Sequence, residues 1–264
     1  MEIIDAHAHI YPEKIAEKAS RAVGDFYGIP MEYIGTAQGL LEEGKKAGIS
    51  RFLVHSVATT PHQVHSINTF IYNEMQAHPE FIGFITLHPD LTVSEIKEEI
   101  NYAIENGFKG IKLHPDFQKF YIDDPNLFKI YKEASGKLPI LFHMGDKRYD
   151  YSSQERLVRV ANEFKDLECI AAHFGGYSTW GNYREYENLK YGNVYFDTSS
   201  SLYFLEKYKA LQIIRKFGVD KFFFGTDYPM WDAKEELERF FSLGLTDEEN
   251  EMILSKNIKK LLNL

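Results

Sequence analysis

Eight short apolar or β-branched runs recur along this 264-residue chain, and helix-like stretches separate them. The runs begin at Glu2, Arg51, Phe81, Phe108, Leu138, Leu167, Asn193 and Lys221. Such a rhythm is typical of βα units arranged around a parallel sheet. The sequence lacks the Gly-x-Gly-x-x-Gly turn of a dinucleotide-binding fold. The alternation therefore predicts an α/β fold of the (β/α)8 TIM-barrel type rather than an open doubly wound sheet.

The stretches between these runs show helical periodicity. One face of the stretch 93–107 carries Val93, Ile96, Ile100 and Ile104. Further helices are expected near residues 36–47, 64–77, 126–135, 153–164, 202–217 and 247–262. The connection between the first two runs, residues 10–50, is the longest, so we expect an extended first βα connection.

Composition narrows the class of protein. Hydrophobic residues make up 44% of the chain and charged residues 26%, as in a globular protein with a large core. No linker or change in composition marks a boundary, so we expect a single domain over residues 1–264. A net charge of −9 disfavours a nucleic-acid partner. A lone cysteine, Cys169, and the lack of a visible signal peptide or membrane span predict a cytoplasmic protein with no membrane partner.

Titratable residues gather at the carboxyl ends of the expected strands. Seven of the ten histidines stand there, followed by two aspartates: His7, His9, His55, His88, His114, His143, His173, Asp197 and Asp227. A TIM barrel builds its active site at this end of its strands. His7 and His9 are two residues apart, so they share one face of a strand. Imidazole and carboxylate ligands without cysteine suit a catalytic site for zinc, iron or manganese.

The chain resembles the amidohydrolase superfamily, in particular its amidohydrolase 2 branch of TIM-barrel metal-dependent hydrolases. The resemblance rests on motifs that follow the family's order from residue 3 to 229, namely "IDAHAHIYP", "GFKGIKLHP", "LFHMG", "AAHFGG", "YFDTSS" and "FGTDYP". It implies a metal-ligand set of His7, His9, His143 and Asp227. It also implies that His173 lies beside the reacting group.

The resemblance leaves the number of metal ions open. Binuclear members bridge two ions with a carbamylated lysine from the fourth strand, and Lys112 fits that role. His114 lies nearer the end of the strand, however, so we expect one divalent ion. Zinc is expected first, with manganese or iron as alternatives.

The implied reaction is hydrolysis of an amide, ester or lactone bond in a small organic substrate by metal-activated water. Asp227 would accept the proton of this water, and His173 would stabilise the oxyanion or act as an acid and base. The same branch contains nonoxidative decarboxylases, similar to aminocarboxymuconate semialdehyde decarboxylase, which share the opening Asp-x-His-x-His. Decarboxylation of a small unsaturated or aromatic carboxylate is therefore the alternative. A non-catalytic metal-binding barrel is a third reading, but it predicts the loss of a ligand position.

Further residues are candidates for the substrate pocket. Arg148 follows the fifth strand and has the charge to pair with a substrate carboxylate. Tyr177 and Trp180 follow the sixth strand and would flank an organic substrate. His55 and His88 are either pocket residues or hydrogen-bonded core. The only small molecule expected to bind is a substrate. Because barrels of this branch are often dimers, the resemblance also suggests a homodimer.

Overall fold

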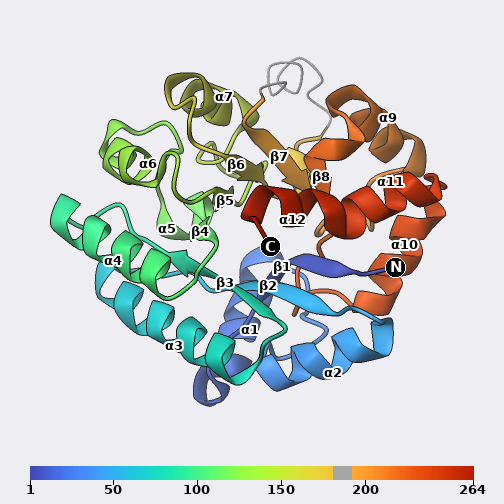
Figure 1. Ribbon diagram of the computed structural model, residues 1–264, viewed down its shortest axis with the longest axis horizontal. Coiled ribbons are helices and arrows are strands. Elements are labelled where there is room, and N and C mark those ends of the chain that lie inside the picture. Colours follow the sequence, from blue (N-terminus) through green and yellow to red (C-terminus); the bar gives the residue numbers. More distant parts are fainter. Residues whose placement is uncertain (181–191) are drawn as a thin grey trace. The chain divides into compact units, whose positions relative to one another are not determined.

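The computed structural model describes residues 1–180 and 192–264. Its strands form an eight-stranded parallel sheet in chain order (Figure 1). They are β1 (Ile4–His9), β2 (Arg51–His55), β3 (Phe81–Thr86), β4 (Gly110–Leu113), β5 (Ile140–Phe142), β6 (Cys169–Ala171), β7 (Val194–Asp197) and β8 (Phe222–Phe223). Each strand lies in one of the eight predicted runs, and among the described residues an α-helix lies between every two successive strands except β6 and β7. The predicted (β/α)8 TIM-barrel class is confirmed.

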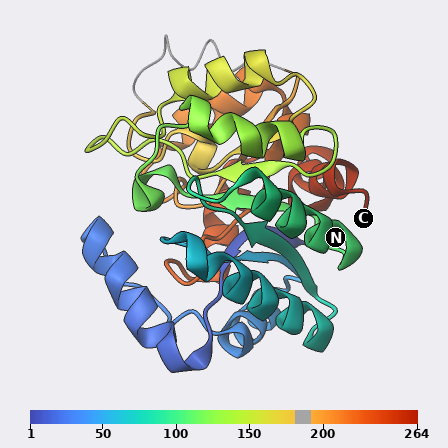
Figure 2. The same ribbon diagram turned by 90° about the vertical axis from the view of Figure 1, so that its left-hand side faces the viewer.

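The helices agree with the sequence periodicity, with three exceptions. They are α1 (Glu13–Tyr27), α2 (Ala37–Ala47), α3 (Val64–Ala77), α4 (Val93–Glu105), α5 (Pro115–Gln118), α6 (Phe128–Ala134), α7 (Gln154–Glu163), α9 (Lys207–Phe217), α10 (Ala233–Ser242), α11 (Asp247–Glu251) and α12 (Asn257–Leu262). The helices α1, α5 and α10 were not expected. Helix α1 (blue in Figure 2) buries only Ala16, Ser20 and Gly24, so it lacks the stripe of large apolar residues that marks a helix in a sequence. Among the described residues, no helix is both long and apolar enough to span a bilayer.

The internal contacts divide the chain into two compact units. The first comprises Met1–Ser56, Glu74–Ile82 and Thr198–Leu264, and the second comprises Val57–Asn73 and Gly83–Asp197. The first unit therefore contains β1, β2 and β8, and the second contains β4 to β7 and most of β3. That all 264 residues form one domain stays a prediction.

In the first unit, β1 is hydrogen-bonded on both of its edges. The Ala6 N–H donates to the Phe224 carbonyl at 2.8 Å, and the Ile10 N–H donates to the His55 carbonyl at 3.1 Å. Helix α2 packs closely on β2 because residue 44 is glycine. A Cβ at this position would lie only 2.0 Å from the Phe52 ring. Helices α2 and α10 lie side by side (Figure 1). This packing places the carboxyl ends of β1 and β2 next to each other.

In the second unit, the strands share a register that aligns their carboxyl ends. Leu113 pairs with Phe142, and Phe142 pairs with Ala171. His114 and His143 directly follow β4 and β5. The shared register therefore places these two histidines side by side at the carboxyl ends of their strands. Helix α4 begins with a capping box in which the Thr92 hydroxyl accepts from the Glu95 N–H at 3.3 Å. Helices α4 and α6 pack side by side (Figure 2).

A buried carboxylate joins β1 to the segment after β8 within the first unit. Asp5 is fully buried. Its Oδ1 accepts from the backbone N–H groups of His7 and Thr226, each at 3.0 Å, and its Oδ2 accepts from the Thr226 hydroxyl at 2.6 Å. A buried charge is tolerated when donors surround it in this way. Asp5 therefore fixes the backbone of His7 against the segment that carries Asp227.

Helix α10 carries a second buried carboxyl group. Glu236 is fully buried, and its Oε1 accepts from Arg239 Nη1 at 2.6 Å. Burial raises the pKa of Glu236 to about 7, although Arg239 acts in the opposite direction. Desolvation therefore outweighs the ion pair at this position, and the charged form of Glu236 destabilises the folded state.

We expect the substitution Glu236→Gln to change how stability depends on pH. The folded-state pKa lies above the ordinary value of 4.5, so Glu236 contributes stability below pH 4.5 that is lost as the pH rises to about 7. Because glutamine does not ionise, the variant should gain about 1 to 3 kcal/mol relative to the parent over this window. Urea unfolding on each side of the window measures the difference. The control is Glu235→Gln, since Glu235 is an exposed partner of Arg239. A Glu236→Gln effect that does not change with pH contradicts the prediction.

Loss of the Asp5 carboxylate should destabilise the protein strongly. In Asp5→Ala, the buried donors of His7 and Thr226 lose this acceptor, and each buried unsatisfied donor costs about 1 to 3 kcal/mol. The free energy of unfolding in urea should therefore fall by about 3 kcal/mol or more. Asp5→Asn keeps one acceptor oxygen and should lose less. An Asn variant as unstable as the Ala variant would show that the acceptor role of Asp5 is unimportant.

Candidate metal centre

Three of the four residues that the resemblance implies as metal ligands converge in the first unit. His7 Nε2 lies 3.4 Å from Asp227 Oδ1, and His9 Nε2 lies 3.5 Å from the same oxygen. The two histidines lie in the carboxyl-terminal half of β1, and the Asp227 N–H donates to the His7 carbonyl at 2.8 Å. This backbone bond holds the carboxylate over the end of the strand. The fourth implied ligand, His143, belongs to the second unit.

The spacing of these donor atoms fits a metal ion. Ligand atoms bonded at about 2.1 Å to a tetrahedral ion lie about 3.4 Å from one another. The two distances to Asp227 Oδ1 match that value closely. Two imidazole nitrogens and one carboxylate oxygen are also the donors that zinc, manganese or iron accepts. His7, His9 and Asp227 are therefore suited to bind a divalent ion.

His55 packs against the same pair of histidines. It ends β2 and is fully buried. Its ring makes edge contacts with His7 and His9, at centroid distances of 4.8 and 4.4 Å. Nitrogen atoms of the three rings lie within 4.8 Å of one another. His55 is thus part of the candidate site and not an isolated core histidine.

Two ligand candidates of the first unit, His7 and Asp227, have hydrogen-bond partners that the sequence did not predict. His7 Nδ1 lies 3.1 Å from Ser199 Oγ, and the Ser200 hydroxyl donates to Asp227 Oδ2. Burial, together with the negative charge of Asp227, raises the pKa of Tyr11 well above its usual value, so this phenol keeps its proton. The sequence could have pointed to both serines, because they lie just after the carboxyl end of a predicted strand.

The second unit brings together His143 and His173. His143 Nδ1 and His173 Nε2 are 3.0 Å apart, and both residues are buried. The His173 N–H donates to Asp197 Oδ1 at 2.9 Å, and the Trp180 indole N–H donates to the His173 carbonyl at 2.8 Å. His173 is therefore held on both sides of its peptide, with its ring directed at His143.

Asp116 is a further residue that the sequence interpretation missed. Its Oδ2 lies 3.7 Å from His143 Nε2 and accepts from the Ser152 hydroxyl at 2.7 Å. Burial raises the pKa of Asp116 to about 7. The His114 ring stacks on the His143 ring, with centroids 4.0 Å apart and planes only 8° apart. A carboxyl group near one nitrogen of an imidazole is a common arrangement behind a metal-binding histidine. It leaves His143 Nδ1 as the nitrogen directed at His173.

The loops after β5 and β6 pack tightly in the second unit. Gly145 has φ of 73°, and a Cβ there would lie 2.5 Å from the Gly176 backbone. This contact leaves the Tyr177 ring 5.8 Å from the rings of both His143 and His173. Tyr177 thus lies near both histidines, and that it flanks a substrate stays a prediction.

Other predicted pocket residues are engaged within their own segments. Arg148 forms a two-point ion pair with Asp146, at 2.9 Å from Nε to Oδ1 and 2.6 Å from Nη2 to Oδ2. His88 is buried, and its Nδ1 accepts from the Asp90 N–H at 3.2 Å; desolvation lowers the pKa of His88. Lys112 is fully buried in β4. That Lys112 does not bridge two ions stays a prediction.

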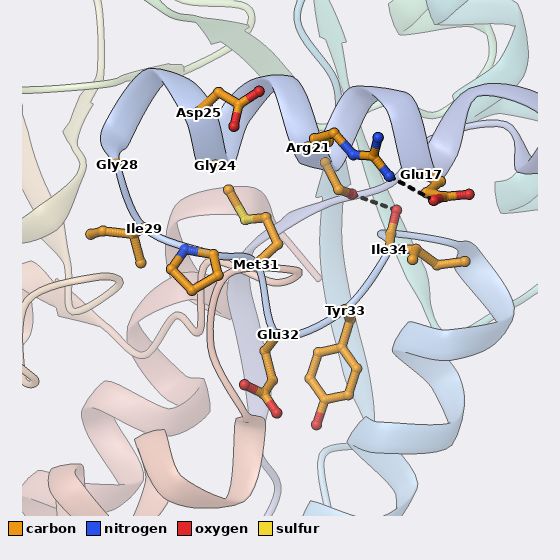
Figure 3. Close-up of a pocket in the computed structure, with 12 residues that line it drawn as sticks. Glu17, Arg21, Gly24, Asp25, Gly28, Ile29, Met31, Glu32, Tyr33 and Ile34 are labelled. Carbon is orange, nitrogen blue, oxygen red and sulfur yellow. Dashed lines mark hydrogen bonds and ion pairs between the residues drawn. The ribbon is translucent and has the colours of Figure 1, made fainter.

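A separate pocket of about 530 Å³ lies between α1 and residues 29–34 (Figure 3). Within its wall, Arg21 pairs with Glu17 at 3.0 Å, and the Ser20 hydroxyl donates to the Ile34 carbonyl. None of the candidate ligands lines this pocket. It is therefore distinct from the metal centre.

Comparison with known proteins identifies the family of this chain. A family model described as amidohydrolase matches residues 4–264. No curated protein matches the sequence significantly. The family match covers all the ligand candidates in both units.

Several solved structures share the fold over the whole chain. An uncharacterised TIM-barrel protein from Bordetella bronchiseptica is 20% identical, with a TM-score of 0.81 and coverage of 100% of this chain and 99% of that one. The 5-carboxyvanillate decarboxylase of Sphingomonas paucimobilis is 16% identical, with a TM-score of 0.78 and coverage of 100% and 99%. A dihydroxybenzoic acid decarboxylase from a Polaromonas species, solved with manganese and 2-nitroresorcinol, is 16% identical, with a TM-score of 0.76 and coverage of 100% and 97%.

These structural likenesses establish the TIM-barrel fold, whereas the family match establishes descent. The motif order in the sequence and the convergence of His7, His9 and Asp227 agree with both. This chain belongs to the amidohydrolase 2 family of the TIM-barrel amidohydrolase superfamily.

Proposed function

We propose that this protein is a metal-dependent enzyme that removes carbon dioxide from a small aromatic carboxylate without an oxidant. The convergence of the two β1 imidazoles with the Asp227 carboxylate supports metal dependence. The choice of reaction rests on the similar structures, which include decarboxylases of 5-carboxyvanillate and of dihydroxybenzoic acid. The sequence alone favoured hydrolysis. This proposal instead places decarboxylation first.

In this proposal His7, His9, His143 and Asp227 bind one divalent ion. Manganese is the first choice, because two of the similar decarboxylases were solved with it. When bound, the ion would supply a Lewis acid that polarises the oxygen atoms of the substrate. The ligand set itself accepts zinc or iron as well.

The protein side chains then have to move one proton. Asp227 would take up a proton from solvent water and deliver it to the ring carbon that bears the carboxylate. The bond from this carbon to the carboxylate breaks, its electron pair returns to the ring, and carbon dioxide leaves. His173, which is held through its own peptide by Asp197 and Trp180, positions a substrate oxygen during this step.

The same proposal assigns the substrate a flat, unsaturated shape. Tyr177 lies beside the rings of His143 and His173, and the Trp180 ring is 6.4 Å from the Tyr177 ring. Aromatic side chains favour offset or edge contacts with a flat ring. Arg148 is a weaker candidate for the substrate carboxylate, because Asp146 already occupies its guanidinium.

Metal analysis tests the ligand assignment. Protein purified without chelator and loaded with Mn²⁺ should hold about one equivalent, and His7→Ala, His143→Ala and Asp227→Asn should each hold far less, because each loses a ligand. The exposed His62 provides a control, His62→Ala, which should retain the ion. Undiminished metal in both His7→Ala and Asp227→Asn would overturn the assignment, and two equivalents in the parent would overturn the single-ion proposal.

A substrate panel tests the reaction. We expect release of carbon dioxide from one or more hydroxybenzoates or carboxyvanillate-like acids, only when metal is bound. His173→Asn should lower kcat by about 10²- to 10⁴-fold with its metal content retained, because an acid-base or positioning group is lost. Hydrolysis of an ester, lactone or amide without carbon dioxide release would favour the hydrolase instead. Full metal occupancy without turnover on any substrate would favour a non-catalytic barrel.

A further inference from the structure

Three consecutive hydroxyl side chains after β7 contact the segments that carry the metal ligands. Thr198, Ser199 and Ser200 are fully buried and belong to the first unit, together with His7 and Asp227. The Thr198 N–H donates to the Phe223 carbonyl at 3.0 Å, and its hydroxyl accepts from the Gly225 N–H at 3.1 Å. These bonds fix the backbone of the segment against β8 and leave the two serines facing the ligands.

Ser199 is placed to select the ring form of His7. An imidazole binds a metal ion through one nitrogen while the proton remains on the other. The hydrogen-bond partner of the second nitrogen determines which nitrogen carries the proton. Ser199 Oγ lies 3.1 Å from His7 Nδ1. If this oxygen accepts the Nδ1 proton, the lone pair is left on Nε2. Nε2 is the atom that lies 3.4 Å from Asp227 Oδ1.

Ser200 is placed to turn the Asp227 carboxylate. The Ser200 oxygen accepts from the Trp231 indole N–H at 2.8 Å, so its own proton is free to go to Asp227 Oδ2. A carboxylate is a stronger acceptor than the nearby Met230 sulfur, which lies 3.4 Å away. With Oδ2 engaged, Oδ1 is the oxygen that faces the two histidines.

The backbone supports this interpretation. Ser200 has φ of 49° and Asp227 has φ of 63°, both in the left-handed region that residues with a Cβ rarely adopt. A residue held in this region is strained and persists there only where the surroundings impose it. Two strained residues joined directly by a hydrogen bond indicate that the orientation of this carboxylate is imposed by the fold.

We propose that Ser199 and Ser200 are positioning residues of the metal centre. Ser199 sets the tautomer of His7, and Ser200 directs Asp227 Oδ1 toward the ion. The inference rests on the metal site of the proposed function and is independent of which reaction that site performs. Ser201 is the natural comparison, because it is equally buried and its hydroxyl donates to the Ser199 carbonyl at 2.9 Å rather than to a ligand side chain.

Metal affinity of the matched alanine variants tests the proposal. In metal-stripped protein titrated with Mn²⁺ against a chelator, Ser199→Ala and Ser200→Ala should raise the Kd by about 10- to 100-fold. Ser201→Ala should stay within about threefold of the parent. The Co²⁺ absorption spectrum, which reports ligand geometry, should change in the first two variants and not in the third. Equal affinities and spectra in all three variants would overturn the inference.

A measurement on the unsubstituted protein covers the case in which a variant does not fold. The ¹⁵N chemical shifts of His7 in metal-free protein should show the proton on Nδ1, and a proton on Nε2 instead would overturn the role of Ser199. The two proposals fail in different ways. A parent protein that binds no divalent ion contradicts the proposed function, whereas a parent that binds one while both serine variants bind it equally well contradicts this inference alone.

Discussion

The meeting of the Asp227 carboxylate with the two imidazoles of β1 is the contact on which the candidate site depends. A carboxylate that is mostly buried needs compensating charge or donors, because removal from water penalises its charged form. Asp5 and the backbone bond from Asp227 to His7 hold the two segments at this separation. A cation at the same place would satisfy Asp227 and both imidazoles at once. Binding of a cation would therefore offset the cost of burying Asp227 beside His7 and His9.

Three of the four ligand candidates are supported from behind by a second polar group. His7 has a hydroxyl, Asp227 has a hydroxyl that is itself held by an indole, and His143 has the carboxyl group of Asp116. Such outer contacts fix which atom of a ligand is available, and they limit side-chain motion before any ion binds. The arrangement is what a catalytic metal centre requires, because a ligand that must reorient on binding weakens affinity for the metal.

The ligand set does not by itself choose between hydrolysis and decarboxylation. Both reactions use a metal to polarise an oxygen atom, and they differ in whether the proton ends on a leaving group or on carbon. In the proposed function the groups around His173 bear on this difference, because the rings of Tyr177 and Trp180 lie near it and aromatic side chains contact a flat ring well. The candidate ligands therefore leave the reaction open.

The sequence alone determined the eight strands and the kinds of side chain at their ends. Buried strands read as continuous apolar runs, and histidines at the ends of such runs are conspicuous. It did not reveal α1, whose buried face consists of small residues, nor the pairing of Arg148 with Asp146. Only the tertiary structure decided that Ser199 contacts His7 and that Ser200 contacts Asp227, because those hydrogen bonds join segments distant in the chain. A local pattern shows that a residue is polar and near a strand end, but the partner it meets is set by how the strands pack.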